Sequence, residues 1–525
     1  MDCSKEDYEC WPWELEDVED SFKSIEEEVI PENRQSPGAI GPSYIRMLQE
    51  VGMKLAPPVA ENGPQNDDEQ QEEEPATWTA QGVRNQWQTT TTDSGMKRRT
   101  AWAAFVNPVM IMPNLKIKDD AVVSRVLIED GRAVGVELLE RGGWGWVGGC
   151  RATRQLRFAP GSCGEIVLSS GAFRTPKLLM LSGVGPKEHL EEKGVPVVVD
   201  SPHVGSNLQD HLLLGGAHLT TQPTPDAGRM ADGMQGMAYF SFPTEGSRTT
   251  GETDLSTGLD AATFPAAAAA AATATATASA TGTECSAKPS ASPVLGYLFW
   301  DGNFLEMEAH LLVDFLLRKP GVLNAVLRVV ICFVAWVAVK LTPLGGFLRK
   351  RTRGAAMLLT TVKSRGTVRL RSRDATAPPD IDPAYMSCQD DARAWFESWR
   401  ILRRATRETV EGKASLGLEL SPGIMYNHGN DYESFLRWVQ NSALSFMHPV
   451  GTCRMGAGLE DSVVSSANLR VHGVAGLRVA DASVAPRIPH TPTQAMAMMI
   501  GDRAAAIVLK DRFAKERMQV RNKYL

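Results

Sequence analysis

Runs of alternating and β-branched residues predict strands in the first third of the chain. Three such runs are LKI (115–117), AVVSRVLIED (121–130) and RAVGVELLE (132–140), and the turn GRA (131–133) joins the last two. They are expected to form hairpins that lead into a buried strand, EIVLSSGAF (165–173). The pattern therefore predicts a sheet early in the chain.

Other segments predict helices and one exposed strand. After the buried strand, TPKLLMLSGVG (175–185) predicts a tight turn and a short helix, which Thr175 caps and in whose first turn Pro176 lies. The stretch GTVRLRSRD (366–374) alternates like an exposed antiparallel strand, and 390–408 has the spacing of an amphipathic helix. The end of the chain reads as a strand, a proline-rich loop and a helix.

Composition shifts divide the chain into four regions. Two segments carry little that could be buried: the acidic, glutamine-rich 61–75 and the Ala/Thr-rich 261–284. The expected regions are an N-terminal remnant with its acidic linker (1–98), a part that carries the motif at 171–185 (99–216), a divergent region with the Ala/Thr insert and an apolar segment at 320–348 (217–363), and a C-terminal region (364–525).

Charge and cysteine content exclude several classes of protein. With 55 basic and 62 acidic residues, the net charge of −7 makes non-specific nucleic-acid binding a poor expectation. The eight cysteines include no C-x-x-C pair, which argues against a zinc ribbon and a dense disulfide framework and favours a reducing, intracellular compartment. The acidic N-terminus has no apolar core of a secretory signal.

The apolar segment leaves two interpretations open. Its charge-free core, 329–339, is shorter than the roughly 20 residues that cross a bilayer, which favours a buried helix of a substrate-binding region. The basic cluster that follows at 349–353 is typical of a membrane surface, so membrane contact through 320–353 is the other interpretation.

One glycine motif is set aside. Gly143, Gly145 and Gly148 spell G-x-G-x-x-G, which cradles a pyrophosphate only between a strand and a helix. The residues that follow, RATRQLRF (151–158), do not form an amphipathic helix, and two tryptophans between the glycines crowd the approach. We interpret the motif as the tip of a hairpin.

Four motifs in order along the chain carry more information. They are GAFRTPKLLMLSGVG (171–185), VGSNLQDH (204–211), HPVGTCRMG (448–456) and GLRVADASVAP (476–486). Together with KSRGTVRLRSRDATAPPDIDPAYM and MIGDRAAAIV, they make the chain resemble the glucose–methanol–choline (GMC) flavin oxidoreductases over roughly 99–214 and 364–510. The first motif matches the second signature of that family at every fixed position.

The resemblance implies a fold, a cofactor and a set of site residues. The expected fold is α/β: an incomplete doubly wound FAD-binding domain, without the family's first G-x-G-x-x-G unit, and a substrate domain with an antiparallel sheet. FAD is the implied cofactor, and no metal is implied. The residues expected to line FAD are Val123, Asn207, Asp481, Ala482, Thr493 and Gln494, whereas Asp210 and His211 are expected to anchor the loop.

The resemblance also implies a catalytic pair. His448 is the implied base, but the position of its usual polar partner falls on Pro492, which cannot donate a hydrogen bond. Either the loop shifts so that His490 serves, or the pair is broken; both interpretations stay open.

Two functions follow. The first is an FAD-dependent oxidation of a small-molecule alcohol, with hydride passing to flavin N5 and an aldehyde or ketone as the product. The alternative is a truncated, non-catalytic homologue that does not hold FAD.

Overall fold

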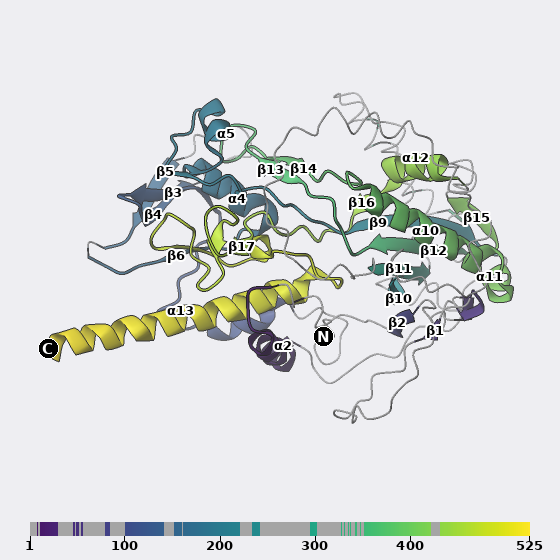
Figure 1. The fold of residues 1–525 in the computed structure, drawn as a ribbon, viewed down its shortest axis with the longest axis horizontal. Coiled ribbons are helices and arrows are strands. Elements are labelled where there is room, and N and C mark those ends of the chain that lie inside the picture. Colours follow the sequence, from purple (N-terminus) through teal and green to yellow (C-terminus); the bar gives the residue numbers. More distant parts are fainter. Residues whose placement is uncertain are drawn as a thin grey trace, which may run out of the picture.

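The computed structural model has two lobes, with the chain crossing between them several times (Figure 1). It describes residues 11–29, 100–140, 152–159, 161–220, 351–421 and 431–524, residue 8, the strands at 54–55, 79–84, 234–241 and 294–301, and isolated positions at 46–47, 49–51 and between 327 and 347. The expected linker 61–75 and insert 261–284 lie outside the described residues, as does nearly all of the apolar segment.

The first lobe combines a small antiparallel sheet with a parallel pair of strands. The antiparallel sheet has the order β3-β4-β5, formed by Ala121–Glu129, Arg132–Glu140 and Ala152–Arg157. The parallel pair joins β6 (Ile166–Leu168) to β19 (Leu477–Val479), strands far apart in the sequence. The strands predicted over 121–130 and 132–140 and their turn are confirmed: Gly131 has φ +72°, which a tight turn requires.

Smaller elements complete this lobe. They are α4 (Gly171–Leu181), β7 (Val184–Gly185), α5 (Lys187–Glu192), β8 (Val199–Asp200), β13 (Thr367–Arg369), β14 (Asp380–Asp382), β17 (Met455–Gly456), β18 (Val464–Ser465), a π-helix (Trp102–Val106) and 3₁₀ turns at Asn107–Val109 and Ala482–Val484. The expected strand at 115–117 is wrong: this stretch forms no ladder and is exposed. Two apolar residues, one on either side of Lys116, do not make a strand when no neighbouring strand pairs with them.

The second lobe is an eight-stranded sheet covered by helices. Its order is β1-β2-β10-β11-β12-β9-β15, with β16 on the side of β9. The strands are β1 (Lys54–Leu55), β2 (Thr79–Arg84), β9 (Leu212–Leu219), β10 (Met234–Ser241), β11 (Val294–Asp301), β12 (Thr352–Leu359), β15 (Leu418–Ser421) and β16 (Leu444–Ser445). All but the β1–β2 pair are antiparallel. The antiparallel substrate sheet is thus present.

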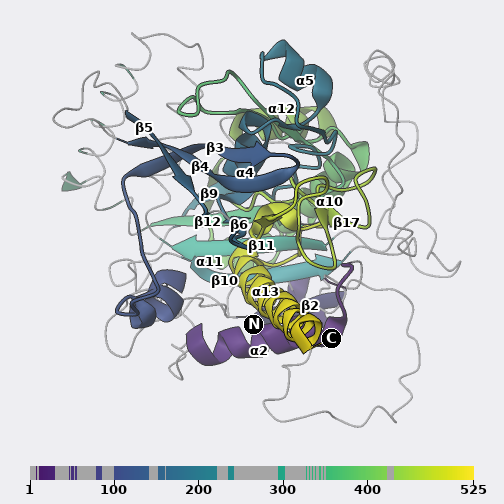
Figure 2. The same cartoon turned by 90° about the vertical axis from the view of Figure 1, so that its left-hand side faces the viewer.

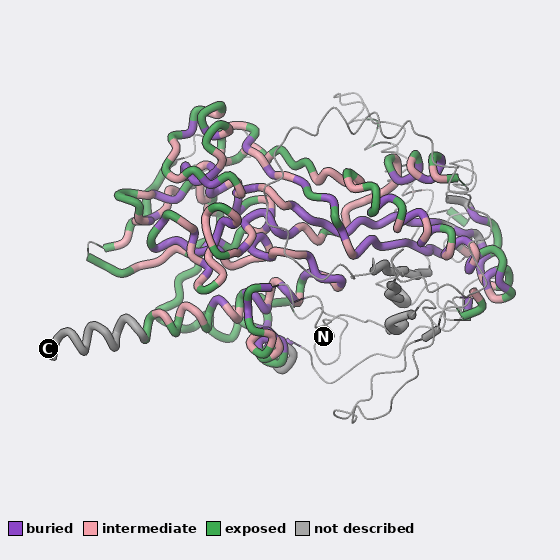
Figure 3. The backbone as a smooth tube through the Cα atoms, viewed as in Figure 1, coloured by how far each residue is buried: buried purple, intermediate pink, exposed green. Residues whose placement is uncertain are grey.

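Three helices accompany this sheet: α10 (Gln389–Arg407), α11 (Val410–Ser415) and α12 (Tyr432–Ser442) (Figure 2). The amphipathic helix predicted over 390–408 is α10. Its buried Trp395 and Trp399 pack with Phe435 and Trp438 of α12 over Leu212 and Met357 of the sheet. The buried parts of the chain run through strands β9 and β12 and into the first lobe (Figure 3).

The start of α4 differs from the sequence prediction. The helix begins at Gly171 rather than after Thr175, so Pro176 lies inside it and cannot donate to the carbonyl of Ala172. The hydroxyl of Thr452, which is fully buried, donates to that carbonyl at 2.6 Å. A side chain from a distant loop thus satisfies the acceptor that the proline leaves open.

The final helix packs against the N-terminal segment, which is itself tied to the first lobe. Helix α13 (Thr493–Tyr524) packs against α2 (Leu15–Val29) and extends past the lobe to the C-terminus (Figure 1). Arg503 pairs with Asp17 at 2.6 Å, and the indole of Trp13 donates to the carbonyl of Ser466 at 2.8 Å. The N-terminal segment is therefore part of the core of this lobe.

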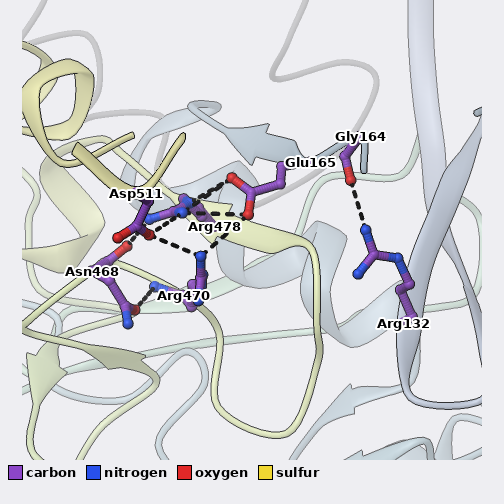
Figure 4. Close-up of polar contacts among 7 residues, drawn as sticks. All are labelled: Arg132, Gly164, Glu165, Asn468, Arg470, Arg478 and Asp511. Carbon is purple, nitrogen blue, oxygen red and sulfur yellow. Dashed lines mark hydrogen bonds and ion pairs between the residues drawn. The ribbon is translucent and has the colours of Figure 1, made fainter. Parts of the chain in front are cut away.

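A buried ion network holds α13 to the parallel strands (Figure 4). Arg478 of β19 is 2% exposed; its guanidinium pairs with Glu165 beside β6 at 3.1 Å and with Asp511 of α13 at 2.7 Å. Arg470 contacts the same two carboxylates. In the same view, Arg132 donates to the carbonyl of Gly164. Two arginines shared between two acids fix the helix against the strands.

Within the described residues, no helix has both the length and the apolar character needed to cross a bilayer. Most of the segment 320–353, for which membrane contact is one interpretation, lies outside the described residues.

We expect Thr452→Val to lower the free energy of unfolding by about 1–3 kcal/mol, because the carbonyl of Ala172 is then buried without a donor. Chemical denaturation measures this change. In a Pro176→Ala background the backbone N–H at position 176 can serve the carbonyl, so the same substitution should cost less. Equal costs in both backgrounds would contradict the account.

Candidate active site

Strand pairing brings two histidines together at the junction of the lobes. Antiparallel pairing of β16 with the start of β9 places Ser445 opposite Leu212, and the backbone N–H of Phe446 donates to the carbonyl of His211 at 2.8 Å. His448 follows two residues later. The Nδ1 atoms of His211 and His448 lie 2.9 Å apart, with the rings nearly perpendicular.

Asp210 organises the loop that carries His448. Its Oδ1 accepts the backbone N–H of His448 at 2.9 Å, and its Oδ2 accepts the hydroxyls of Tyr385, at 2.7 Å, and Ser445. Burial raises the pKa of the carboxyl, against the effect of these donors. The carboxylate connects β9, the loop after β14 and the loop after β16.

The residue before His448 has a strained backbone. Met447 has φ +64°, a left-handed conformation that non-glycine residues rarely adopt, and its side chain is exposed. Its N–H donates to the hydroxyl of Ser445 at 2.9 Å. Such a conformation persists only where the surroundings impose it, and here the contacts of Asp210 and Ser445 on either side do so.

Burial keeps both imidazoles neutral. The pKa of His448 falls to about 4 because burial penalises the charged form. His211 is completely buried, and its pKa lies well below the ordinary 6.5 through burial and the nearby His448 and His490. A neutral imidazole can accept a proton, so the pair offers a base at neutral pH.

His490 belongs to the same cluster. It is 8% exposed and close enough to influence the pKa of His211. The loop that carries it is tied to the 204–211 motif through Gln209, whose side chain donates to the carbonyl of Pro486 and accepts the N–H of Ile488. The structure therefore brings His448 and His490, the two predicted catalytic residues, around a third histidine, His211.

The predicted FAD-lining residues fall into two groups. Asn207, with φ +61°, donates to the carbonyl of Gly451 and anchors the loop beside His448. The carboxylate of Asp481 is used inside the protein: it accepts from the backbone of Gly171 at 2.9 Å and from the hydroxyl of Thr175 at 2.6 Å. Thr175 thus ties α4 to the loop after β19 instead of capping the helix.

The remaining positions differ in how far they are exposed to solvent. Val123 of β3 is partly buried against the core, and Ala482 begins the 3₁₀ turn after β19. Thr493 begins α13 and is buried, whereas Gln494 beside it is exposed.

The carboxyl edge of the parallel pair fits a dinucleotide. Strands β6 and β19 end side by side, joined by the N–H of Ala480 to the carbonyl of Leu168. Gly171 follows β6 with φ +81°, and a side chain there would face open space; Ser169 and Ser170 are exposed. Open space at this edge is where α/β sheets bind dinucleotides, so FAD fits the residues present.

Family models identify the chain. A model described as GMC oxidoreductase matches residues 13–213, and a second of the same description matches 362–501. Together they cover more than half of the sequence, and the chain belongs to the GMC oxidoreductase family, whose members are FAD-dependent flavoproteins.

Curated relatives and solved structures agree with this family. The chain is 31% identical over 416 residues to an oxygen-dependent choline dehydrogenase of Sinorhizobium medicae, covering 79% of this chain and 61% of that protein. It is 31% identical to a fatty acid photodecarboxylase of Chlamydomonas reinhardtii, covering 78% of this chain and 60% of that protein. The chain thus spans about three fifths of these relatives.

Structural likeness supports the fold. An FAD-dependent oxidoreductase from Chaetomium thermophilum superposes with a TM-score of 0.61 at 20% identity, covering 98% of this chain and 84% of that one. A fungal aryl-alcohol oxidase gives 0.59 at 21% identity, covering 97% and 84%. The α/β GMC fold predicted from the motifs is confirmed.

Sequence reasoning missed part of the site. It treated His211 only as a loop anchor, and it did not single out Tyr385 or Ser445. The pairing of β16 with β9 creates these contacts, and a two-residue strand leaves little periodicity to detect.

We expect the lowered pKa of His448 to reduce the free energy of unfolding at acidic pH. The folded pKa of His448, about 4, lies below the ordinary 6.5, so the unfolded state binds its proton more tightly. This contribution to stability is complete above pH 6.5 and is lost as pH falls toward 4. Chemical denaturation at pH 7 and pH 5 measures this change. From pH 7 to pH 5 the free energy of unfolding should fall by about 1–2 kcal/mol less in His448→Gln than in the unchanged protein.

Phe446→Leu is the control, because it alters packing against the His448 ring without removing a titrating group. If the free energy of unfolding fell equally with pH in the unchanged protein and in His448→Gln, the lowered pKa of His448 would be contradicted.

Proposed function

We propose that this protein takes part in FAD-dependent oxidation of the CH–OH group of a small alcohol, with His448 as the base. The observation that carries the proposal is the partly buried imidazole of His448, whose pKa burial lowers and whose Nδ1 contacts His211. Its Nδ1 is occupied by His211, so Nε2 is the nitrogen left for a substrate.

The carboxyl edge of β6 and β19 and the start of α13 are the proposed seat of FAD. The residues proposed to hold it are Val123, Asn207, Asp481, Ala482, Thr493 and Gln494, with Asp481 and Ala482 acting through their backbone. When bound there, FAD would supply the hydride acceptor for oxidation of the carbinol carbon.

The chain's own residues handle the proton. Nε2 of His448 accepts the hydroxyl proton of the alcohol, and the carbonyl product forms as the hydride leaves. His490 is proposed to donate a hydrogen bond to the developing alkoxide, since it is close enough to influence the pKa of His211, the neighbour of His448. Burial of the three rings keeps water from competing for these contacts.

Small alcohols are the proposed substrate class because relatives include proteins named choline dehydrogenase and aryl-alcohol oxidase. The alternative is a non-catalytic homologue that does not hold FAD, which is supported by Pro492 standing where a polar partner is expected. A flavin absorption spectrum of the purified full chain, before and after incubation with FAD, separates them. A colourless protein that takes up no flavin would favour the alternative.

His448→Gln should lower turnover with alcohols by about 10²–10⁴-fold, because general-base catalysis contributes on that order. Flavin content should be unchanged. Stopped-flow reduction of the flavin by a panel of primary alcohols measures the effect. Loss of less than tenfold with full flavin content would rule out His448 as the base.

A second pair of variants decides which residue partners His448. Because His490 lies in the histidine cluster, His490→Leu should lower flavin reduction, and Pro492→His should not restore it in that background. If Pro492→His alone raised the rate and His490→Leu left it unchanged, the partner would be missing from this chain.

A further inference from the structure

The contact between His211 and His448 constrains where their protons lie. Two Nδ1 atoms at 2.9 Å form a hydrogen bond only if one carries the proton and the other offers its lone pair. Either His448 donates, which leaves its Nε2 unprotonated, or His211 donates, which leaves His448 protonated at Nε2. Only the first arrangement leaves a base nitrogen for a substrate.

The surroundings of His211 are compatible with the first arrangement. The backbone carbonyls of Pro489 and Thr360 act to raise the pKa of His211, against the larger effect of its burial. Because Nδ1 of His211 is engaged by His448, Nε2 is the nitrogen that carries the proton of His211 when His448 donates. Among the described residues no acceptor meets that Nε2 in good hydrogen-bond geometry, so the choice between the two arrangements rests on the base that the proposed function requires.

We propose that His211 is a positioning residue that fixes the tautomer of His448, accepting the Nδ1 proton of His448 and leaving its Nε2 lone pair to face the substrate. This proposal rests on the proposed function, because it concerns the nitrogen that acts as the base. It assigns to His211 a role distinct from packing.

The arrangement also keeps the transferred proton on His448. After Nε2 of His448 takes a proton, the imidazolium still donates through Nδ1 to His211. Passing that proton on would charge a ring that is completely buried and lies beside two other histidines, His448 and His490. Asp210 does not neutralise that charge through a side-chain contact, since its described donors are Tyr385, Ser445 and backbone N–H groups.

Backbone hydrogen bonds hold the rings of His211 and His448 in contact. The carbonyl of His211 accepts the N–H of Phe446, and the carboxylate of Asp210 accepts the N–H of His448. Two adjacent residues at the entry of β9 therefore fix both the backbone and the ring of His448. Removing the His211 ring should free the tautomer without moving the loop.

Imidazole ¹⁵N NMR of the full chain without substrate tests the proposal. His448 signals, assigned by their loss in His448→Gln, should show a protonated Nδ1 and an unprotonated Nε2. In His211→Leu the two tautomers should mix, whereas His211→Asn, whose amide oxygen can accept from Nδ1, should retain the original form. His203→Leu, a histidine outside this network, is the control and should leave the His448 signals unchanged.

The kinetic counterpart separates this role from a structural one. His211→Leu should lower the rate of flavin reduction about tenfold or more with KM changed less than about twofold, and His211→Asn should recover most of the rate. An Nε2-protonated His448 in the unchanged protein, or an unchanged tautomer in His211→Leu, would overturn the proposal. The first of these outcomes is measured on the unchanged protein alone, so the proposal can be overturned even if the variants fail to fold.

Failure of the proposed function looks different. The NMR measurement needs no turnover, so a protein with the expected tautomer that never reduces flavin contradicts only the alcohol oxidation. A protein that reduces flavin with alcohols while His448 is protonated at Nε2 contradicts the role of His211 and the choice of Nε2 as the base, but not the alcohol oxidation itself.

Discussion

The carboxylate of Asp210 is the contact on which the site depends. It accepts the backbone of His448 and the hydroxyls of Tyr385 and Ser445, so one buried group collects donors from two separate stretches of chain and ties them to its own. Without this carboxylate, few contacts would stabilise the left-handed backbone at Met447, and the imidazole of His448 would no longer be fixed in position. A single acid therefore converts a strained turn into a defined position for a base.

The same segment joins the two lobes. Residues 204–211 run from the core of the first lobe to the entry of β9, and bridges tie Leu208 to Gly366 and Gln209 to Val450. Gly205, with φ +74°, lies so close to the carbonyl of Val368 that a side chain would collide with it. The path admits little adjustment, so the parallel strands and the antiparallel sheet keep a fixed relation at the histidine cluster.

Much of this could be predicted from the sequence, and the reasons differ by element. Strands β3 and β4 and helix α10 carry strong periodicity, and the ordered motifs identified the family and His448. The start of α4 could not be predicted, because Pro176 looked like a first-turn residue and only Thr452, far along the chain, makes its interior position tolerable. The contact of His211 with His448 was missed because it arises from pairing with a two-residue strand, which local patterns do not reveal.

The bond from Thr452 to the carbonyl of Ala172 has an evolutionary consequence. Thr452 follows His448 by only four residues, so the loop that carries His448 also completes helix α4 of the first lobe. In a lineage that replaced Pro176, the backbone could donate to the carbonyl of Ala172, and position 452 would be free to vary. A lineage that lost Thr452 first would be less stable until Pro176 was replaced as well. The two sites should therefore change together among descendants of this chain, although neither touches a substrate.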